Sequence, residues 1–251
     1  MIEAAGVTYL GHATVLLELG GRRVLTDPVL SDRLLHLRRH SAPVTAPLEP
    51  LDCVLISHLH HDHLDLASLR KLPRETTAVV PAGGRDLLER AGLGDVREVR
   101  AGDNLELPDL RIEAVPASHS GARRPLGPSA DALGYVLAAG RRRIYFAGDT
   151  DLFDEMGELG ELDLALLPVW GWGTSIGEGH LDPARAAEAL RRLRPRIAIP
   201  IHWGTFLPIW TSRRQRRRLH EPAREFARLA ADAAPEVEVK ILEPGQSTSL
   251  P

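Results

Sequence analysis

The sequence predicts an α/β or α+β fold in which sheets are covered by helices. Many short apolar or alternating runs have the length and pattern of strands, and helix-forming runs stand between several of them. No shift in composition marks a linker within the 251 residues, so we expect a single domain over residues 1–251. A chain of this length can bury a core large enough to hold a preorganised site.

The apolar and alternating runs predict the strands in order along the chain. The pair Gly20-Gly21 joins two such runs and indicates a hairpin. Prolines from Pro28 to Pro50 indicate a surface excursion, with a short helix expected near Asp32–Leu37. The expected strands are Val7–Leu10, Thr14–Leu19, Arg22–Thr26, Cys53–Ile56, Ala78–Val80, Val96–Val99, Leu110–Pro116, Leu133–Ala138, Arg143–Ala147, Leu162–Leu167, Ile197–Ile201 and Val237–Leu242.

Three segments between or after these runs predict helices. Gly84–Ala91 has helical spacing of its apolar residues. Asp182-Pro183 is an N-cap followed by proline at the first helical position, and the run ARAAEALRRL after it consists of helix formers. Ser212–Ala231 is expected to be a long arginine-rich helix, with Pro222 as the point where it would break.

Composition excludes several classes of function. The chain has 31 basic and 34 acidic residues, a net charge of −3, whereas general nucleic-acid binders are basic, so we expect no nucleic-acid partner. Cys53 is the single cysteine, which excludes an intramolecular disulfide and any cysteine-rich cluster. The N-terminus lacks a basic signal-peptide region and no run reaches the roughly 20 apolar residues of a membrane span, so we expect a cytoplasmic protein.

Histidine clustering is the most informative feature of the chain. Four histidines and an aspartate stand within the six residues His58–His63, directly after the expected buried strand Cys53–Ile56. Three more residues of ligand type, His119, Asp149 and His202, each follow another expected strand. Zinc prefers imidazole and carboxylate ligands, so the pattern indicates a metal centre. The alternative is a polar loop of solvated histidines.

The motif HLHHDH, followed by His119, Asp149 and His202, resembles the ligand motifs of the metallo-β-lactamase superfamily in order and approximate spacing. The resemblance covers nearly the whole chain and implies a four-layer αββα sandwich with the ligands at one edge of two packed sheets. It implies two divalent cations, zinc by default and manganese or iron as alternatives. It also implies the ligand sets: His58, His60 and His119 for one ion, Asp62, His63 and His202 for the other, and Asp149 as the bridge. His61 has no ligand role in that family.

Four stretches, YLGHATVLLE, LTDPVLS, GHLDPARAAEAL and PIHWGTF, resemble the branch that contains N-acyl-phosphatidylethanolamine phospholipase D and ascorbate-6-phosphate lactonase. This resemblance implies that a metal-bound hydroxide attacks a phosphodiester, or an ester or lactone, of a soluble small-molecule substrate. Asp62 would then also orient the nucleophile. His180 would face the metals, as a contact to substrate phosphate or as a proton donor; alternatively it braces the helix that starts at Asp182.

Two rivals remain from other functional classes. Sulfur dioxygenases of the same superfamily use one iron and a related motif, and leave the ligands of the second ion unused. A binding module on the same fold would lack turnover, although a full ligand set argues against it. Metal analysis of anaerobically purified protein separates the first rival, because two zinc ions favour hydrolysis and one iron favours oxygenation.

Several residues around the motif carry two interpretations each. His12 is expected behind the ligands or in a structural role rather than in catalysis. Asp27-Pro28 either orients the metal loop from behind or ends a strand and opens a turn. Three tryptophans either line the pocket mouth or pack in the core: Trp170, Trp172 and Trp203.

One arginine run stands out, and it consists of Arg213, Arg214, Arg216, Arg217 and Arg218. It could bind phospholipid headgroups, nucleic acid or an acidic partner, or form a solvated helix face paired with Glu221 and Glu225. Five arginines in six positions spread around a helix, so we expect the solvated face and no stable membrane association. The apolar residues before the run are expected to wall the pocket: Phe206, Leu207, Ile209 and Trp210. A homo-oligomer is compatible with the sequence.

Overall fold

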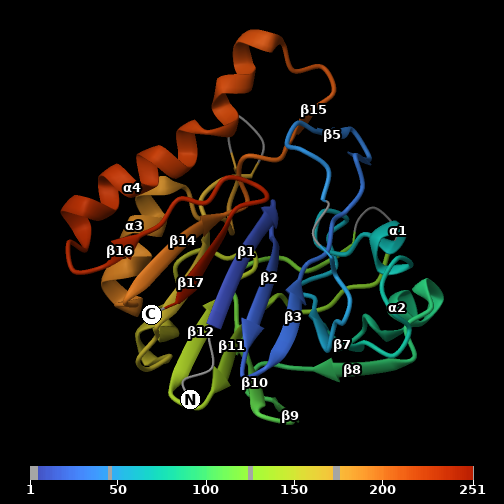
Figure 1. Ribbon diagram of the computed structural model, residues 1–251. Helices are drawn as coiled ribbons and strands as arrows, with labels where there is room; N and C mark the ends of the chain where they lie inside the picture. The colour runs from blue at the N-terminus through green and yellow to red at the C-terminus, as the bar shows by residue number, and fades with distance from the viewer. Residues whose placement is uncertain (1–4, 45–46, 124–126, 172–175, 251) are drawn as a thin grey trace.

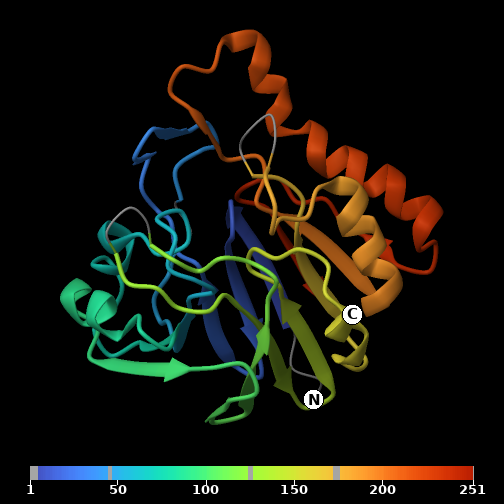
Figure 2. The same ribbon diagram turned by 180° about the vertical axis from the view of Figure 1, so that it is seen from behind.

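The computed structural model describes residues 5–44, 47–123, 127–171 and 176–250. Two seven-stranded sheets face each other, and pairs of helices cover their outer faces (Figures 1 and 2). The expected αββα sandwich is therefore confirmed. A third, three-stranded sheet lies toward one end of the molecule, beside a 3₁₀ helix (Figure 1).

The first sheet begins with the N-terminal strands. The Gly20-Gly21 joint forms the expected hairpin, since both glycines have positive φ (59° and 70°) and the flanking strands pair antiparallel. From β3 onward the strands run parallel, so their carboxyl ends meet at one edge. The strand order is β17 (Ser247–Leu250), β1 (Ala5–Gly11), β2 (Thr14–Leu19), β3 (Arg22–Thr26), β6 (Cys53–Leu55), β7 (Thr77–Pro81) and β8 (Asp95–Val99).

The second sheet combines an antiparallel and a parallel part. Its order is β16 (Glu238–Val239), β14 (Ile197–Ile201), β13 (Leu164–Pro168), β12 (Arg142–Phe146), β11 (Leu133–Ala139), β10 (Leu110–Pro116) and β9 (Asn104–Leu107). Strands β10, β12, β13 and β14 point the same way, because β11 pairs antiparallel with both β10 and β12. Their carboxyl ends therefore also share one edge.

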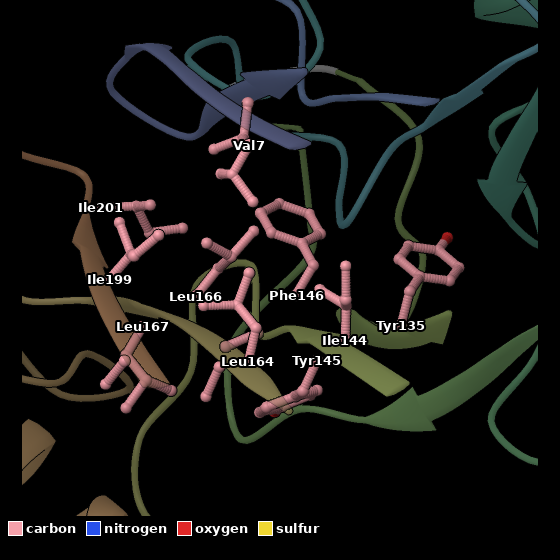
Figure 3. Close-up of a cluster of buried hydrophobic side chains, with 14 of the residues drawn as sticks. Val7, Tyr135, Ile144, Tyr145, Phe146, Leu164, Leu166, Leu167, Ile199 and Ile201 are labelled. Atoms are coloured by element: carbon pink, nitrogen blue, oxygen red, sulfur yellow. The ribbon is translucent and has the colours of Figure 1, made fainter. Parts of the chain in front are cut away.

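Apolar side chains from both sheets fill the space between them. Figure 3 shows Val7 of β1 above Phe146, Leu166 and Ile199 of the second sheet, and all four are buried in one cluster. Burying each such side chain contributes roughly 1.5–3 kcal/mol. This packing fixes the two sheets against each other and so fixes the edge at which their strands end.

Helices seal the outer faces. On the second sheet lie α3 (Pro183–Leu193) and α4 (Glu221–Ala233). The N-cap predicted for α3 is confirmed, because the Asp182 carboxylate accepts a hydrogen bond from Arg185 N at 2.8 Å. On the first sheet lie α1 (Leu66–Leu69) and α2 (Arg85–Ala91). Among the helices of the described ranges, none is long and apolar enough to cross a membrane.

The helix expected near Asp32–Leu37 is wrong. That segment forms β4 (Arg33–Leu34) and β5 (Leu37–Arg39), which turn at Leu35 (φ 52°). They pair with β15 (Phe206–Pro208), a strand not expected from the sequence, whose Phe206 packs on Leu34 and Leu37. A strand from the far end of the chain thus overrides the local helical pattern.

The long arginine-rich helix is also wrong as a single element. The 3₁₀ helix η2 covers Arg213–Leu219, and α4 begins separately at Glu221. Pro222 occupies the first turn of α4, where its missing N–H costs no hydrogen bond, so the break falls before the proline rather than at it. The last expected strand, Val237–Leu242, is reduced to the two residues of β16. The sequence also did not predict β9, β15, β17, α1 and the 3₁₀ helix η1 (Asp154–Glu158).

Candidate metal centre

The seven ligand candidates lie where strands of both sheets end. His58 to His63 follow β6, His119 follows β10, Asp149 follows β12 and His202 follows β14. The common direction of β10, β12 and β14 aligns three of these ends, and the packing of the two sheets places them beside the loop that follows β6. The structure therefore brings together residues that are far apart in sequence.

A first group consists of His58, His60 and His119, whose ligand atoms lie within 4.8 Å of one another. His119 Nε2 is 3.2 Å from His60 Nδ1. All three are buried or half-buried. Two nitrogens that approach this closely from different loops suit ligands of one cation.

A second group consists of Asp62, His63 and His202, and His12 joins it within the same 4.8 Å limit. His63 Nε2 is 3.2 Å from His202 Nε2. Asp62 Oδ2 lies 3.8 Å from His63 Nε2 and 3.7 Å from His202 Nε2. His61 belongs to neither group.

Asp149 lies between the two groups. Its Oδ2 is 3.2 Å from His63 Nε2 and its Oδ1 is 3.4 Å from His202 Nε2. It also forms a ligand-type group with His119 and His180. A carboxylate with contacts on both sides has the position that a bridging ligand needs.

Hydrogen bonds behind the first group fix which imidazole nitrogen faces inward. Ser57 Oγ donates to Asp27 Oδ2 at 2.6 Å, so it accepts from His58 Nδ1 at 2.9 Å. His58 Nε2 is then deprotonated, and it is buried without a hydrogen-bond partner. A buried bare lone pair costs free energy unless a cation or donor meets it, so the residues fit a bound metal.

The same arrangement recurs at two other histidines. His119 Nδ1 donates to the carbonyl of Gly179 at 2.8 Å, and His63 Nδ1 donates to Asp27 Oδ2 at 2.6 Å. In both rings Nδ1 is the donor to the protein, so Nε2 is the atom left to face a cation. Metal-binding histidines typically donate their other N–H in this way, which sets the tautomer and the ring orientation.

The electrostatics of the cluster favour a cation. Burial lowers the pKa of His58 well below its ordinary value and that of His60 to about 4, so both are neutral ligands at neutral pH. Burial alone would raise the pKa of Asp62 and Asp149, but the surrounding imidazoles hold both well below the usual range. Burial lowers the pKa of His63, but carboxylates around it, Asp149 first, hold it well above its ordinary value. This centre attracts positive charge.

Asp27 supports the metal loop from behind. Its Oδ1 accepts from Ser57 N at 2.7 Å, and its Oδ2 accepts from Ser57 Oγ and from His63. Of its two interpretations, orientation of the loop is confirmed. Arg123, which sequence analysis missed, donates to the carbonyls of Leu59 and Leu64 at 2.9 Å each. No local pattern marks this arginine, because its partners lie in a distant loop.

The tryptophans and the apolar run before the arginines differ in burial. Trp203 is buried and donates to the carbonyl of Pro200 at 2.8 Å, and Trp170 is buried too, so both pack in the core. Trp172 lies outside the described residues. Phe206 and Leu207 are buried, whereas the last two residues of the expected pocket wall are exposed, Ile209 by 52% and Trp210 by 70%.

His180 lies at the rim of the cluster. Its side chain is 24% exposed, its Nε2 is 3.6 Å from Asp149 Oδ2, and its ring centroid is 4.6 Å from that of His119. Its Nδ1 donates to the carbonyl of Glu178 at 3.1 Å. His180 therefore faces the site with Nε2.

A family described as the Beta-lactamase superfamily domain matches residues 22–203, which include all seven ligand candidates. The chain belongs to the metallo-β-lactamase superfamily. It is 34% identical to the UPF0173 metal-dependent hydrolase MK1542 of Methanopyrus kandleri, over 96% of this chain and 98% of that protein. This relative is named a metal-dependent hydrolase, and the chain is an enzyme of the same class, with the metallo-β-lactamase fold.

Two further relatives of this superfamily chain extend the comparison. It is 33% identical to the N-acyl-phosphatidylethanolamine-hydrolyzing phospholipase D 1 of Caenorhabditis elegans, over 79% of this chain and 64% of that protein. The solved structure of a metallo hydrolase from the archaeon Ignicoccus hospitalis superimposes with a TM-score of 0.75 and 25% identity, covering 99% of both chains. The fold and the enzyme class therefore agree across sequence and structure.

Proposed function

We propose that this chain is a hydrolase that uses two divalent cations, zinc by default, to cleave a phosphodiester or an ester or lactone of a small molecule. The observation that carries the proposal is the position of Asp149 between two complete ligand groups. His58, His60 and His119 would hold one ion, and Asp62, His63 and His202 the other. Bound cations of this kind lower the pKa of a water molecule and polarise the scissile group.

The residues of the chain prepare this chemistry. Asp62 is ionised and 17% exposed, so its carboxylate can accept a hydrogen bond from the attacking water and orient it. His180 Nε2 faces Asp149 from the open side, where it can contact an anionic oxygen or donate a proton to the leaving group. A cavity of about 380 Å³ borders the cluster at His119, and Ser120 and Asp131 also line it.

The two rival functions receive less support. An oxygenase with one iron would not use the second ligand group, yet the ligand atoms of that group lie within 4.8 Å of one another. A binding module has no need of ionised Asp62 beside three ordered imidazoles. Among hydrolases, the named activity of the C. elegans relative supports a phosphodiester as one substrate class.

An activity screen tests the proposal. Metal-loaded protein is assayed on phosphodiesters, lactones and thioesters, with and without a chelator. We expect hydrolysis of at least one class and its loss on chelation. Absence of turnover in every class, with both ions bound, would support the binding module. Oxygen consumption with a thiol substrate and a single iron would support the oxygenase.

His180→Ala should lower turnover roughly 10²-fold or more while metal content is unchanged. The reason is that His180 faces the open side of the cluster but belongs to neither ion's expected ligand set. Turnover is measured by steady-state kinetics beside metal analysis of the same preparation, with His36→Ala on the three-stranded sheet as the control. Wild-type kinetics in His180→Ala would return this residue to the structural interpretation.

We further propose a cytoplasmic protein, with homo-oligomers allowed, that does not associate stably with membranes through its arginine run. The 3₁₀ helix η2 has three residues per turn, so Arg213 and Arg216 share one row while Arg217 and Arg218 occupy two others. Arg217 also pairs with Glu221 at 3.4 Å. These charges do not share one face, so they cannot all approach a bilayer at once.

Anionic vesicles at physiological ionic strength should therefore leave the protein in the supernatant after centrifugation. Ile209 and Trp210 are exposed beside η2, so Trp210→Ser and the charge reversal of Arg216 and Arg217 are the informative variants. Sedimentation that either change abolishes would overturn the expectation and favour a lipid substrate.

A further inference from the structure

We infer that His12 is a positioning residue that holds Asp62 and His202 in place for the second cation; this inference rests on the proposed function. His12 is only 2% exposed and stands outside the ligand sets assigned above. Its Nε2 is 3.2 Å from Asp62 Oδ2, and its ring centroid is 3.9 Å from that of His202. One side chain thus contacts two residues of the second group.

The turn between β1 and β2 is built to present this ring. His12 itself has φ +60°, a left-handed conformation that a residue other than glycine adopts at a cost. Gly11 before it has φ +112°, and a Cβ there would lie 2.5 Å from Thr205 Oγ1. Interactions with the surrounding structure must offset the free-energy cost of these backbone conformations.

That compensation comes from the loop that follows β14. His12 N donates to Thr205 Oγ1 at 2.7 Å, and His12 O accepts from His202 N at 2.7 Å. His202 also has a left-handed backbone, with φ +65°. The two strained segments therefore hold each other, and the position of His202 depends on the turn that carries His12.

The hydrogen bond to Asp62 has a defined direction. A carboxylate that binds a cation is deprotonated and only accepts hydrogen bonds, so at 3.2 Å from Asp62 Oδ2 it is His12 Nε2 that carries the proton and donates it. A nitrogen that carries a proton cannot bind a cation, which makes His12 a partner of a ligand rather than a ligand. On its other side the ring packs edge-on against Phe206, at 5.4 Å between centroids.

His12 also connects the two halves of the site. Asp62 belongs to the loop after β6 in the first sheet, whereas His202 follows β14 in the second. The separation of these two ligands depends on how the sheets pack, and His12 fixes it locally by contact with both. Loss of the donor should therefore weaken the second ion and leave the first group, His58, His60 and His119, intact.

The test compares two amides of different reach. In His12→Gln the side-chain nitrogen can occupy the position of Nε2, whereas in His12→Asn it reaches only the position of Nδ1. The affinity of each of the two sites for zinc is measured by chelator competition on the intact protein. We expect His12→Gln to bind both ions nearly as wild type, and His12→Asn to bind the second ion about 10–100-fold more weakly.

His36→Asn is the matched control, because His36 stacks on Trp210 away from the cluster. Equal affinities in His12→Asn and wild type would overturn the inference, as would equal losses in the Gln and Asn variants, which indicate a packing role. Selective loss of the first ion would overturn it as well. A wild-type protein that binds fewer than two ions would instead contradict the proposed function, so the two failures are distinguishable.

Discussion

We expect the purified chain to bind two divalent cations, and to lose different ions when His119 or His202 is replaced by alanine. His119 belongs to the first group and His202 to the second, and each has a ligand atom within 4.8 Å of the Asp149 carboxylate. Each substitution removes one imidazole ligand and leaves the other group complete. Because the cations bind the folded chain preferentially, the melting temperature should fall after chelation and recover on addition of zinc.

Metal analysis of anaerobically purified protein, before and after reconstitution, measures this expectation. His61→Ala is the control, since His61 lies in the same loop but in neither group. A stoichiometry that stays at one after reconstitution would contradict the binuclear proposal. If His119→Ala or His202→Ala kept both ions at wild-type affinity, the ligand assignment at that position would be wrong.

The sequence was most informative where one short segment contains several ligand candidates. His58–His63 stand together because they form one loop after a buried strand, so their pattern is visible without tertiary structure. His119, Asp149 and His202 could be found because each follows a strand, and strand ends can be located from apolar runs. Their convergence also required that β10, β12 and β14 point the same way and that the second sheet pack on the first with these strand ends beside the loop after β6.

Tertiary contacts account for what sequence analysis missed. The segment of β4 and β5 has a helical pattern in isolation, and only pairing with β15 makes it a sheet. Arg123 acts through partners that are distant in the chain, and a single arginine in a loop predicts no such partner. His12 was expected behind the ligands or in a structural role, but the sequence did not identify Asp62 and His202 as its partners. Motifs therefore located the ligand candidates and Asp27, whereas the role of Arg123 and the partners of His12 emerged from tertiary contacts.

Asp27 is the positioning residue whose change should have the widest effect: Asp27→Asn should weaken both ions. The carboxylate accepts through Oδ2 from Ser57 Oγ and from His63 Nδ1, both at 2.6 Å. In asparagine the oxygen keeps the hydrogen bond from Ser57 N, and an NH₂ group then faces these two donors. His63 must move its proton from Nδ1 to Nε2, which takes that ligand atom away from the second ion.

The substitution also affects the first ion, because Ser57 Oγ connects Asp27 with His58. When its Oγ accepts from the new amide, it must donate to His58 Nδ1, at 2.9 Å, and His58 then carries its proton on Nε2. We therefore expect zinc affinity of both ions to fall by at least about 10–100-fold, measured by chelator competition. Asp52→Asn is the control, because its carboxylate accepts from a backbone N–H, that of Arg23, at 2.8 Å without touching a ligand. Full affinity in Asp27→Asn would show that the tautomers do not depend on this carboxylate, and loss of only the second ion would show that Ser57 does not transmit the reversal.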